Sequence, residues 1–164
     1  MAKLKLDRLD LEILEELQNN CRITNTELAK RVNLSPTPCL ERVKRLESSG
    51  YIKRFAAEVN AKRLGVSLVV FIEISLTRTS PDGFAAFKLA VADVPEIQEC
   101  HLLSGNFDYL IKARVSDMEH YRVLLGETIL SLPGVRESRS YVVMETIKES
   151  NKLNLRDLKR ALST

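Results

Sequence analysis

Cysteine and histidine, the side chains of disulfide frameworks and zinc sites, are scarce in this chain. Its 164 residues include three cysteines (Cys21, Cys39 and Cys100) and two histidines. The cysteines are odd in number, widely separated and not at ligand spacing from a histidine, so neither a disulfide framework nor a zinc site is indicated. We therefore expect reduced, mostly buried thiols and no bound metal.

Catalytic motifs are also absent. His101 falls in an expected strand and His120 on an expected helix, with no Cys, Asp or Glu at motif spacing to either. The chain has no glycine-rich phosphate loop. We expect no catalytic residues, no cofactor and no enzyme activity, although the sheet fold inferred below hosts enzymes in other proteins.

Long hydrophobic runs are missing as well. No stretch approaches the roughly 18 apolar residues of a membrane span, and the N-terminal MAKLKLDRLD lacks the apolar core of a signal peptide. We expect a cytoplasmic protein without membrane contact. The 45% hydrophobic content is enough for the core of one large domain or two small ones.

The residues from Ile23 to Leu46 carry the start and stop signals of two short helices. Thr24 and Glu27 have the Thr-x-x-Glu spacing of a capping box, which predicts a first helix that runs to Val32. A tight turn should follow and lead into the second helix.

The turn residues are typical of such a junction. Asn33 can adopt the left-handed conformation that ends a helix, Ser35 can cap the next helix, and Pro36 fits a first turn. Pro38 leaves the start open between Ser35 and Thr37, because the residue before a proline is pushed out of the α region.

A helical wheel over residues 36–47 separates a packing face from a free face. The packing face holds Pro36, Cys39, Leu40, Val43 and Leu46, and the free face holds Thr37, Pro38, Glu41, Arg42 and Arg45. This predicts a helix-turn-helix whose second helix enters the major groove of DNA. Arg42 and Arg45 would contact bases or adjacent phosphates, and Lys44 and Lys53 would position the protein. A basic face that is merely solvated is the alternative.

The flanking segments complete this unit. A helix is expected from about Asp7 to Asn19, and Tyr51 to Val59 is expected to form a wing of short strands or extended chain. Lys53 and Arg54 in the wing would contact phosphates, although a solvated hairpin is the other interpretation. Residues 1–64 hold 13 Lys and Arg against 9 Asp and Glu, or +4, and residues 65–164 hold 12 against 13, or −1. The basic excess lies with the expected DNA-binding half.

The remaining chain alternates strands and helices. Residues 66–76 form an apolar strand in which Val69 and Phe71 make the second face apolar as well. Helices are expected at 81–92 and 117–130, and further strands at 97–104, 108–115 and 136–147. The sequences VPEIQEC at 94–100 and LPGVRES at 132–138 are alike, which indicates a duplicated βαβ unit.

Two such units predict a four-stranded antiparallel sheet with both helices on one face, the ferredoxin-like βαββαβ arrangement, and hence an α+β fold. The other face would be bare and apolar. We expect it to form the interface of a homodimer, sheet against sheet.

Four motifs together carry a family resemblance: SPTPCLERVKRLE at 35–47, the Gly105-Asn-Phe-Asp-Tyr109 turn, LLGETILSLPGV at 124–135 and YVVME at 141–145. With them the chain, from about Leu6 to Ser150, resembles the Lrp/AsnC family of bacterial transcription regulators. The resemblance implies a winged helix-turn-helix that binds double-stranded DNA, followed by a RAM/ACT-like ferredoxin domain. That domain would assemble dimers into octamers or larger rings and bind a small amino acid between them, with leucine as the first guess.

The resemblance also implies two sets of site residues. DNA contacts are expected from Thr24, Asn25, Ser35, Thr37, Pro38, Glu41, Arg42, Lys44, Arg45, Lys53 and Arg54. Effector contacts are expected from Leu103, Ser104, Gly105, Asp108, Tyr109, Ser138, Ser140, Tyr141 and Val142. From the residues alone, the segment at 105–108 can also be a plain hairpin turn. Within the family pattern, the Asp108 carboxylate would hold the ammonium group of the amino acid.

The expected domains are a winged helix-turn-helix at 1–60, a hinge at 61–65, the ferredoxin-like domain at 66–150 and an extension at 151–164. Compared with the family, the N-terminal arm is shorter, and the amphipathic segment 153–162 is extra and without an indicated role. The expected function is sequence-specific transcription regulation, controlled through amino-acid-dependent assembly, in a nucleoid-associated cytoplasmic protein. A nucleoid-organising protein with little operator specificity is the alternative.

Overall fold

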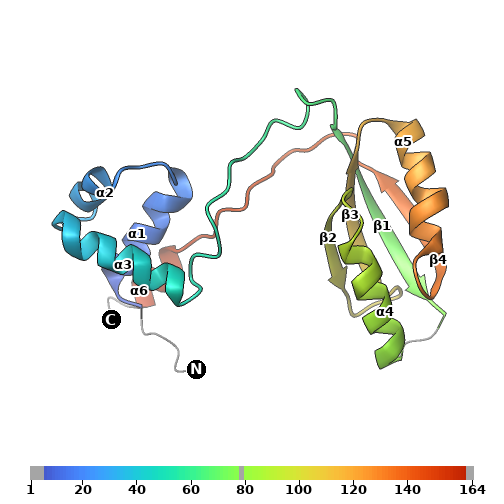
Figure 1. Cartoon of the computed structure of the whole chain (residues 1–164), viewed down its shortest axis with the longest axis horizontal. Helices are drawn as coiled ribbons and strands as arrows, with labels where there is room; N and C mark the ends of the chain where they lie inside the picture. The colour runs from blue at the N-terminus through green and yellow to red at the C-terminus, as the bar shows by residue number, and fades with distance from the viewer. Residues whose placement is uncertain (1–5, 78–79, 162–164) are drawn as a thin grey trace. The chain divides into compact units, whose positions relative to one another are not determined.

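The computed structural model describes residues 6–77 and 80–161. The chain divides into two compact units (Figure 1). One comprises the described parts of residues 1–58 and 149–164, and the other the described part of residues 59–148. None of the described helices has both the length and the apolar composition that a membrane crossing requires.

The first unit begins with helix α1, Arg8–Asn19, which has a complete capping box. Asp7 Oδ1 accepts a hydrogen bond from the Asp10 N–H at 2.9 Å, and Asp10 Oδ2 accepts one from the Asp7 N–H at 3.1 Å. Two backbone donors that a helix start leaves unpaired are thereby satisfied. The start of α1 is fixed by side chains four residues or fewer apart.

Helix α2, Asn25–Arg31, begins after Thr24 as expected, but the predicted capping box is only half formed. The Thr24 hydroxyl accepts a hydrogen bond from the Glu27 N–H at 3.2 Å. The Glu27 carboxylate instead accepts one from Arg31 Nε at 3.2 Å, one turn further along the helix. A side-chain ion pair has displaced the reciprocal half of the box.

The turn into helix α3, Pro36–Ser48, follows the expected chemistry. Asn33 has φ of 55°, the left-handed conformation that asparagine tolerates better than most residues. Ser35 occupies the N-cap position, although its hydroxyl makes no capping hydrogen bond, and Pro36 is the first helical residue. The ambiguity introduced by Pro38 is thus resolved in favour of a start at Pro36.

The three helices enclose a small core. Its buried members are Ile13, Leu28, Ala29, Val32, Cys39 and Leu46. Leu40 was expected on the packing face of α3 but is 42% exposed, so that face is narrower than the wheel predicted. The expectation of mostly buried thiols is also wrong in one case, because Cys21 is exposed while Cys39 is buried and Cys100 half-buried. Burial raises the pKa of the Cys39 thiol.

The segment expected to form the wing has no strand. Residues 53–60 are exposed and carry no regular secondary structure. The chain then makes a hydrogen-bonded turn at residues 61–65, in which the Val66 N–H donates to the Ala61 carbonyl at 3.0 Å. Gly65 has φ of 76°, a conformation open to glycine without strain.

The second unit is built on a four-stranded sheet of β1 (Leu68–Leu76), β2 (Ile97–Leu102), β3 (Tyr109–Val115) and β4 (Val135–Val142). The strand order is β2-β3-β1-β4, and all three pairings are antiparallel. Helix α4 (Pro81–Ala92) and helix α5 (Met118–Val123) pack on the same face (Figure 1). This confirms the ferredoxin-like βαββαβ arrangement.

Several of the expected strand and helix ends differ from those observed, and β1 begins at Leu68 rather than residue 66. Strand β2 ends at Leu102 rather than residue 104, and β4 ends at Val142 rather than residue 147. The helix expected over 117–130 is α-helical only to Val123 and continues as a π-helical turn, Leu124–Thr128, and a 3-10 turn, Ile129–Ser131. Apolar periodicity predicted the length of this helical segment but not its change of pitch.

One sheet face forms the core of this unit. Val70, Ile72 and Ile74 of β1 are fully buried beneath Phe87 of α4 and Tyr121 of α5. The opposite face, expected to be bare and apolar, is mixed. Val69, Phe71, Leu110 and Tyr141 lie on it together with Glu73, Glu99, Lys112, Arg114, Glu137 and Arg139.

The last helix among the described residues is α6, Arg156–Ala161, which belongs to the first unit and contacts α1 (Figure 1). Leu155, just before it, is 8% exposed. The extra C-terminal segment therefore packs on the helix-turn-helix unit. Its expected last residue, Leu162, lies outside the described residues.

Candidate functional site

The first candidate site is the outer side of helix α3, where the structure changes the expected roles of two arginines. Arg42 Nη1 lies 2.6 Å from Asp7 Oδ2 and 2.8 Å from Asp10 Oδ1. Arg45 Nη2 lies 2.6 Å from Asp10 Oδ1 and 2.8 Å from its Oδ2. Asp10 is completely buried, and both arginines reach from α3 toward α1 to bind it. Arg42 is half-buried by this contact, whereas Arg45 remains exposed, as the helical wheel predicted.

The electrostatics explain why Asp10 tolerates burial. A buried carboxylate is costly unless charged donors surround it, and here two guanidinium groups and one backbone N–H supply hydrogen bonds. Asp7, at the edge of this cluster, also binds Arg42. Its pKa is affected by burial, which raises it, but hydrogen bonds from the Asp10 N–H and the Arg42 guanidinium outweigh this and lower the pKa below its usual value.

The exposed surface of α3 is formed mainly by other side chains. Thr37, Glu41 and Lys44 are exposed, Pro38 is half-buried, and Ser35 is exposed at the N-cap. Arg45 keeps 42% of its side chain accessible, compared with 23% for Arg42. The exposed surface is thus polar, with one lysine, one half-exposed arginine and the apolar Leu40.

Two predicted DNA-binding residues of α2 also stabilise the fold. Thr24 caps α2, and Asn25 Nδ2 donates to the Pro36 carbonyl at 2.8 Å, joining the starts of α2 and α3. Asn25 Oδ1 is buried and makes no hydrogen bond within the described part of the chain. Lys53 and Arg54 are exposed on the extended segment that follows α3.

The second candidate site is the loop between β2 and β3, which includes Leu103, Ser104 and Gly105, all exposed. Asp108 closes this loop. Its Oδ2 accepts a hydrogen bond from the Leu76 N–H at 2.7 Å, and its own N–H donates to the Ile74 carbonyl at 2.9 Å. The carboxylate expected to bind a ligand therefore already holds the loop to the end of β1.

Tyr109 was expected among the effector residues, but the structure places it in the core. It is 2% exposed, and its ring stacks on Phe87 with centroids 4.4 Å apart and meets the edge of Phe84 at 5.9 Å. Its hydroxyl has no hydrogen-bond partner among the described residues. Burial, with the charges of Cys100 and Asp108, raises the pKa of this phenol. Tyr109 also lines a second hollow, of about 410 Å³, between α4 and β2.

The predicted effector residues of β4 fall on both sheet faces, because side chains alternate along a strand. Ser138 and Ser140 lie opposite Ile74 and Ile72 and so share the helix-covered face, where the Tyr121 hydroxyl donates to that of Ser140. Val142 is on the same face. Tyr141 lies on the other, where a hydrogen bond with Glu73, helped by burial, raises the pKa of its phenol.

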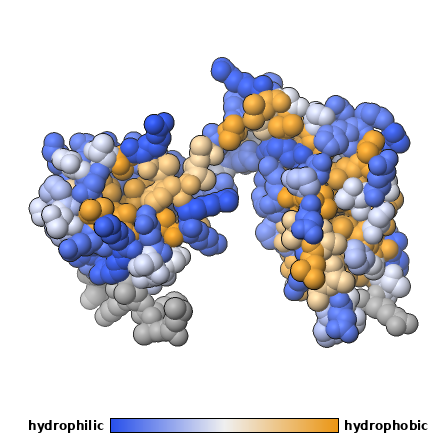
Figure 2. All heavy atoms as spheres, viewed as in Figure 1, coloured by the Kyte–Doolittle hydropathy of each residue, from blue (hydrophilic) through white to orange (hydrophobic). Residues whose placement is uncertain are grey.

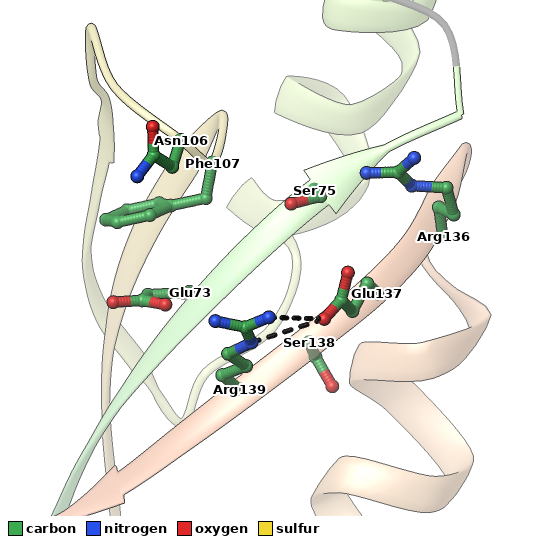
Figure 3. A pocket seen from close by; sticks show the side chains of 8 residues that line it. All are labelled: Glu73, Ser75, Asn106, Phe107, Arg136, Glu137, Ser138 and Arg139. Carbon is green, nitrogen blue, oxygen red and sulfur yellow. Dashed lines mark hydrogen bonds and ion pairs between the residues drawn. The ribbon is translucent and has the colours of Figure 1, made fainter.

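A cavity of about 260 Å³ lies on the open sheet face, beside the β2–β3 loop (Figure 3). Arg139 and Glu137 are hydrogen-bonded to each other there at 3.1 and 3.2 Å. Of its lining, Ser138 and Arg139 fall within the stretch 138–142 that was predicted to contact the effector. The lining residues are Glu73, Ser75, Asn106, Phe107, Arg136, Glu137, Ser138 and Arg139.

The cavity could have been found from the sequence in part. Glu137 and Arg139 are two residues apart in an expected strand, so they must share one face. Which neighbouring strand completes the lining depends on sheet register, which the sequence did not give. The described residues include no group of three or more His, Cys, Asp or Glu side chains that could hold a metal ion.

Comparison with known proteins agrees with this geometry. The model of the winged helix-turn-helix DNA-binding family matches residues 6–53, and that of the Lrp/AsnC ligand binding domain matches residues 69–153. The leucine-responsive regulatory proteins of Escherichia coli and Salmonella typhimurium are each 60% identical to this chain over 148 residues, 90% of either protein.

Solved structures show the same likeness. A transcriptional regulator of Neisseria meningitidis, solved as a complex with L-methionine, is 38% identical with a TM-score of 0.89, covering 94% of this chain and 99% of its own. An AsnC family regulator of Agrobacterium tumefaciens is 33% identical with a TM-score of 0.87, covering 92% and 97%. The chain therefore belongs to the Lrp/AsnC family of transcriptional regulators, with the DNA-binding helix-turn-helix in its first unit and the family's ligand-binding domain in its second.

Proposed function

We propose that this protein is a sequence-specific transcription regulator that binds a small amino acid, leucine first, and responds by changing its assembly. The observation that carries the proposal is the 60% identity to leucine-responsive regulatory proteins, sustained over 90% of both chains. We propose that it works on the nucleoid in the cytoplasm, and that it is not an enzyme, since its relatives are regulators.

On the DNA side, we assign base contacts to the exposed residues of α3, Thr37, Glu41 and Lys44. Arg45, with 42% of its side chain exposed, can reach a phosphate or base while one nitrogen stays on Asp10. Arg42, held by two carboxylates, positions the helix instead. Lys53 and Arg54 contribute sequence-independent phosphate contacts.

On the effector side, the cavity beside the loop at 103–108 supports an amino-acid ligand. It combines two guanidinium groups, Arg136 and Arg139, with the carboxylates of Glu73 and Glu137. A zwitterion presents one charge of each sign, so such a lining can pair with both of its ends. We propose that Leu103 to Gly105, Asp108 and Ser138 to Val142 shape this region in the assembled protein, with Tyr109 supporting it from beneath.

Assembly is proposed to begin with a homodimer through the open sheet face and to continue to an octamer or larger ring. That face carries Val69, Phe71, Leu110 and Tyr141 among charged side chains, and Lys112, directly opposite Phe71, forms an ion pair of 2.9 Å with Glu99. A surface that combines apolar side chains with polar and charged ones is typical of a subunit interface. We keep the domain bounds of 1–60, 61–65, 66–150 and 151–164 as part of this proposal.

The test is a thermal-shift panel of the twenty amino acids, followed by operator titration and sedimentation with the strongest ligand. A ligand at 100 times its dissociation constant stabilises the folded state by roughly 2.7 kcal/mol. Leucine should raise the melting temperature and alter both operator affinity and sedimentation. If no amino acid shifts the melting temperature, the effector assignment is wrong.

Asp108 requires two substitutions because its carboxylate also holds β1. Asp108→Ala removes the hydrogen bond to the Leu76 N–H and should destabilise the protein by about 1.5 to 3 kcal/mol, whatever the ligand. Asp108→Asn keeps an oxygen acceptor and removes the charge. We expect it to fold and to bind operator but to ignore the amino acid, and an unchanged ligand response would place the ammonium contact elsewhere.

A nucleoid-organising protein with little operator specificity is the second candidate, favoured by the sparse set of exposed basic side chains on α3. Footprinting separates the two. Discrete protected sites spaced by helical turns are expected for a regulator, whereas uniform coverage that follows protein concentration would indicate an architectural role.

A further inference from the structure

The C-terminal segment contacts helix α1 through a reciprocal pair of hydrogen bonds. The Leu153 N–H donates to Gln18 Oε1 at 2.7 Å, and Gln18 Nε2 donates to the Leu153 carbonyl at 3.3 Å. Next to it, Lys152 Nζ donates to Asn19 Oδ1 at 3.1 Å. A side-chain amide that pairs with both polar groups of one residue fixes the position of the backbone, not only of a side chain.

The contact continues into α6 with one buried apolar side chain and one ion pair. Leu155 is 8% exposed, whereas Leu158, on the same segment, is 54% exposed. Lys159 pairs with Glu15 of α1. Leu155 is thus the buried apolar side chain of this segment, and Lys152 and Lys159 are its basic side chains bound to α1, which offers Asn19 and Glu15.

The same segment is continuous with the last strand of the other unit. Only residues 143–151 separate the end of β4 from the first contact with α1, which Lys152 makes. The helix-turn-helix unit is therefore joined to the ligand-binding unit by two stretches of chain, residues 53–67 and residues 143–151. A second connection reduces the set of orientations open to a linked domain, because both links must be satisfied together.

We propose that residues 149–161 are a second tether, which holds the DNA-binding unit by α1 and restricts how its recognition helix can be placed on DNA. The inference rests on the proposed function, since it assumes that paired helix-turn-helix units engage one operator. Within the first unit, α1 carries the constraint onward through Asp10, which binds both Arg42 and Arg45 of α3. The second tether and the recognition helix α3 are thus both bound to the same helix, α1.

The test compares Leu155→Asp with Leu158→Asp, which place the same charge on the buried and the exposed side of the segment. Amide hydrogen exchange at Leu153 reports docking, because this N–H donates to Gln18 of α1. Exchange at Lys159, whose N–H donates to the Leu155 carbonyl, reports whether α6 stays helical. We expect fast exchange in Leu155→Asp and protection in both the natural protein and Leu158→Asp.

The functional readout is the dependence of affinity on half-site spacing, measured on paired half-sites in phase and shifted by half of the roughly 10.5-bp helical turn. Linked binding adds about 10²- to 10⁴-fold in affinity and is lost when geometry forbids simultaneous engagement. The natural protein and Leu158→Asp should lose affinity by a factor of that order on the shifted operator. Leu155→Asp should lose several-fold less, because its units can reorient.

Charge reversal gives an independent check that does not remove apolar packing. Glu15→Lys should weaken the spacing dependence, and adding Lys159→Glu should restore it by re-forming the pair. A spacing dependence unchanged in Leu155→Asp, with its tail amides exchanging freely, would overturn the tether. Failure of the natural protein to prefer any operator would instead contradict the proposed function, while exchange protection would still measure docking.

Discussion

At the scale of single residues, the most consequential feature is Asp10, a buried carboxylate that binds two arginines of the recognition helix. Removing one partner from a buried ion pair leaves unpaired charge and costs about 3 to 5 kcal/mol. We expect Asp10→Ala to lower the free energy of unfolding by that amount. Asp157→Ala, whose carboxylate is 86% exposed in its pair with Arg160, should change it by less than about 1 kcal/mol.

Chemical denaturation monitored by far-UV circular dichroism measures both variants. If the two substitutions lowered the free energy of unfolding by the same amount, burial of the carboxylate would not account for its contribution. The interpretation of Asp10 would then be contradicted. Asp10 is not among the residues assigned to contact DNA. If Asp10→Ala lowered operator affinity by more than the reduced fraction of folded protein explains, α1 would also shape the DNA-binding surface.

Asp7 gives a prediction for acid pH. Its folded-state pKa is lowered, so its carboxylate contributes stability above its unfolded pKa of about 3.9, and this stability is lost as pH falls through the folded-state pKa. Asp7→Asn should therefore be less stable than the natural protein at pH 7, and the difference should shrink below about pH 4. Urea midpoints at pH 7, 4 and 2.5 test this, and a difference independent of pH would exclude an electrostatic origin.

At the scale of elements, the turn between α2 and α3 depends on one residue with positive φ. Asn33 at 55° lies in the left-handed region, which costs a residue with Cβ and no compensating polar group about 1 to 2 kcal/mol. Asn33→Ala should destabilise the unit by about that amount, whereas Asn33→Gly should be close to neutral. Thermal unfolding of the two variants gives the comparison, and equal losses would mean that the asparagine amide, not the backbone, matters.

In the sheet, local sequence pattern determined which side chains of one strand share a face, and tertiary contact determined which side chains of different strands are neighbours. Alternation along β1 was visible in the sequence, and the buried face of Val70, Ile72 and Ile74 agrees with it. The opposite face was judged from β1 alone and expected to be apolar. Pairing with β3 and β4 brings charged residues beside Phe71, because register, set by the whole sheet, decides which side chains become neighbours.

At the scale of the whole molecule, exposed apolar side chains point to assembly. Phe71 lies half-buried on the open sheet face, and Met144 and Ile147, on the stretch that follows β4, are 99% and 85% exposed. Figure 2 shows hydrophobic atoms along the stretches that connect the two units. Burying each such side chain in an interface would contribute about 1.5 to 3 kcal/mol.

Phe71→Asp should therefore dissociate the proposed homodimer. Leu89→Asp, on the outer side of α4 and 73% exposed, is the matched control and should leave assembly intact. Sedimentation velocity distinguishes monomer from dimer and higher forms. A Phe71→Asp protein that still sediments as a dimer would place the interface on another surface, and loss of assembly in both variants would indicate a general effect of added charge.

The sequence by itself determined the elements whose signals lie within a few residues of one another. The start of α2 at Thr24, the left-handed Asn33 and the limits of α4 all rest on capping and periodicity, whereas the start of α3 was narrowed only to the range between Ser35 and Thr37. The duplicated βαβ pattern also gave the sheet topology, because connections of this kind leave few alternatives.

Only the tertiary structure decided which distant side chains meet. Arg42 and Asp10 are 32 residues apart, Asp108 and Leu76 also 32, and Gln18 and Leu153 135. A helical wheel cannot show that an arginine on the side opposite the core binds a neighbouring helix. A turn motif likewise cannot show that Tyr109 packs beneath α4. These outcomes depend on helix crossing, sheet register and the return of the C-terminal segment to α1, all of which are set by packing of the folded chain as a whole.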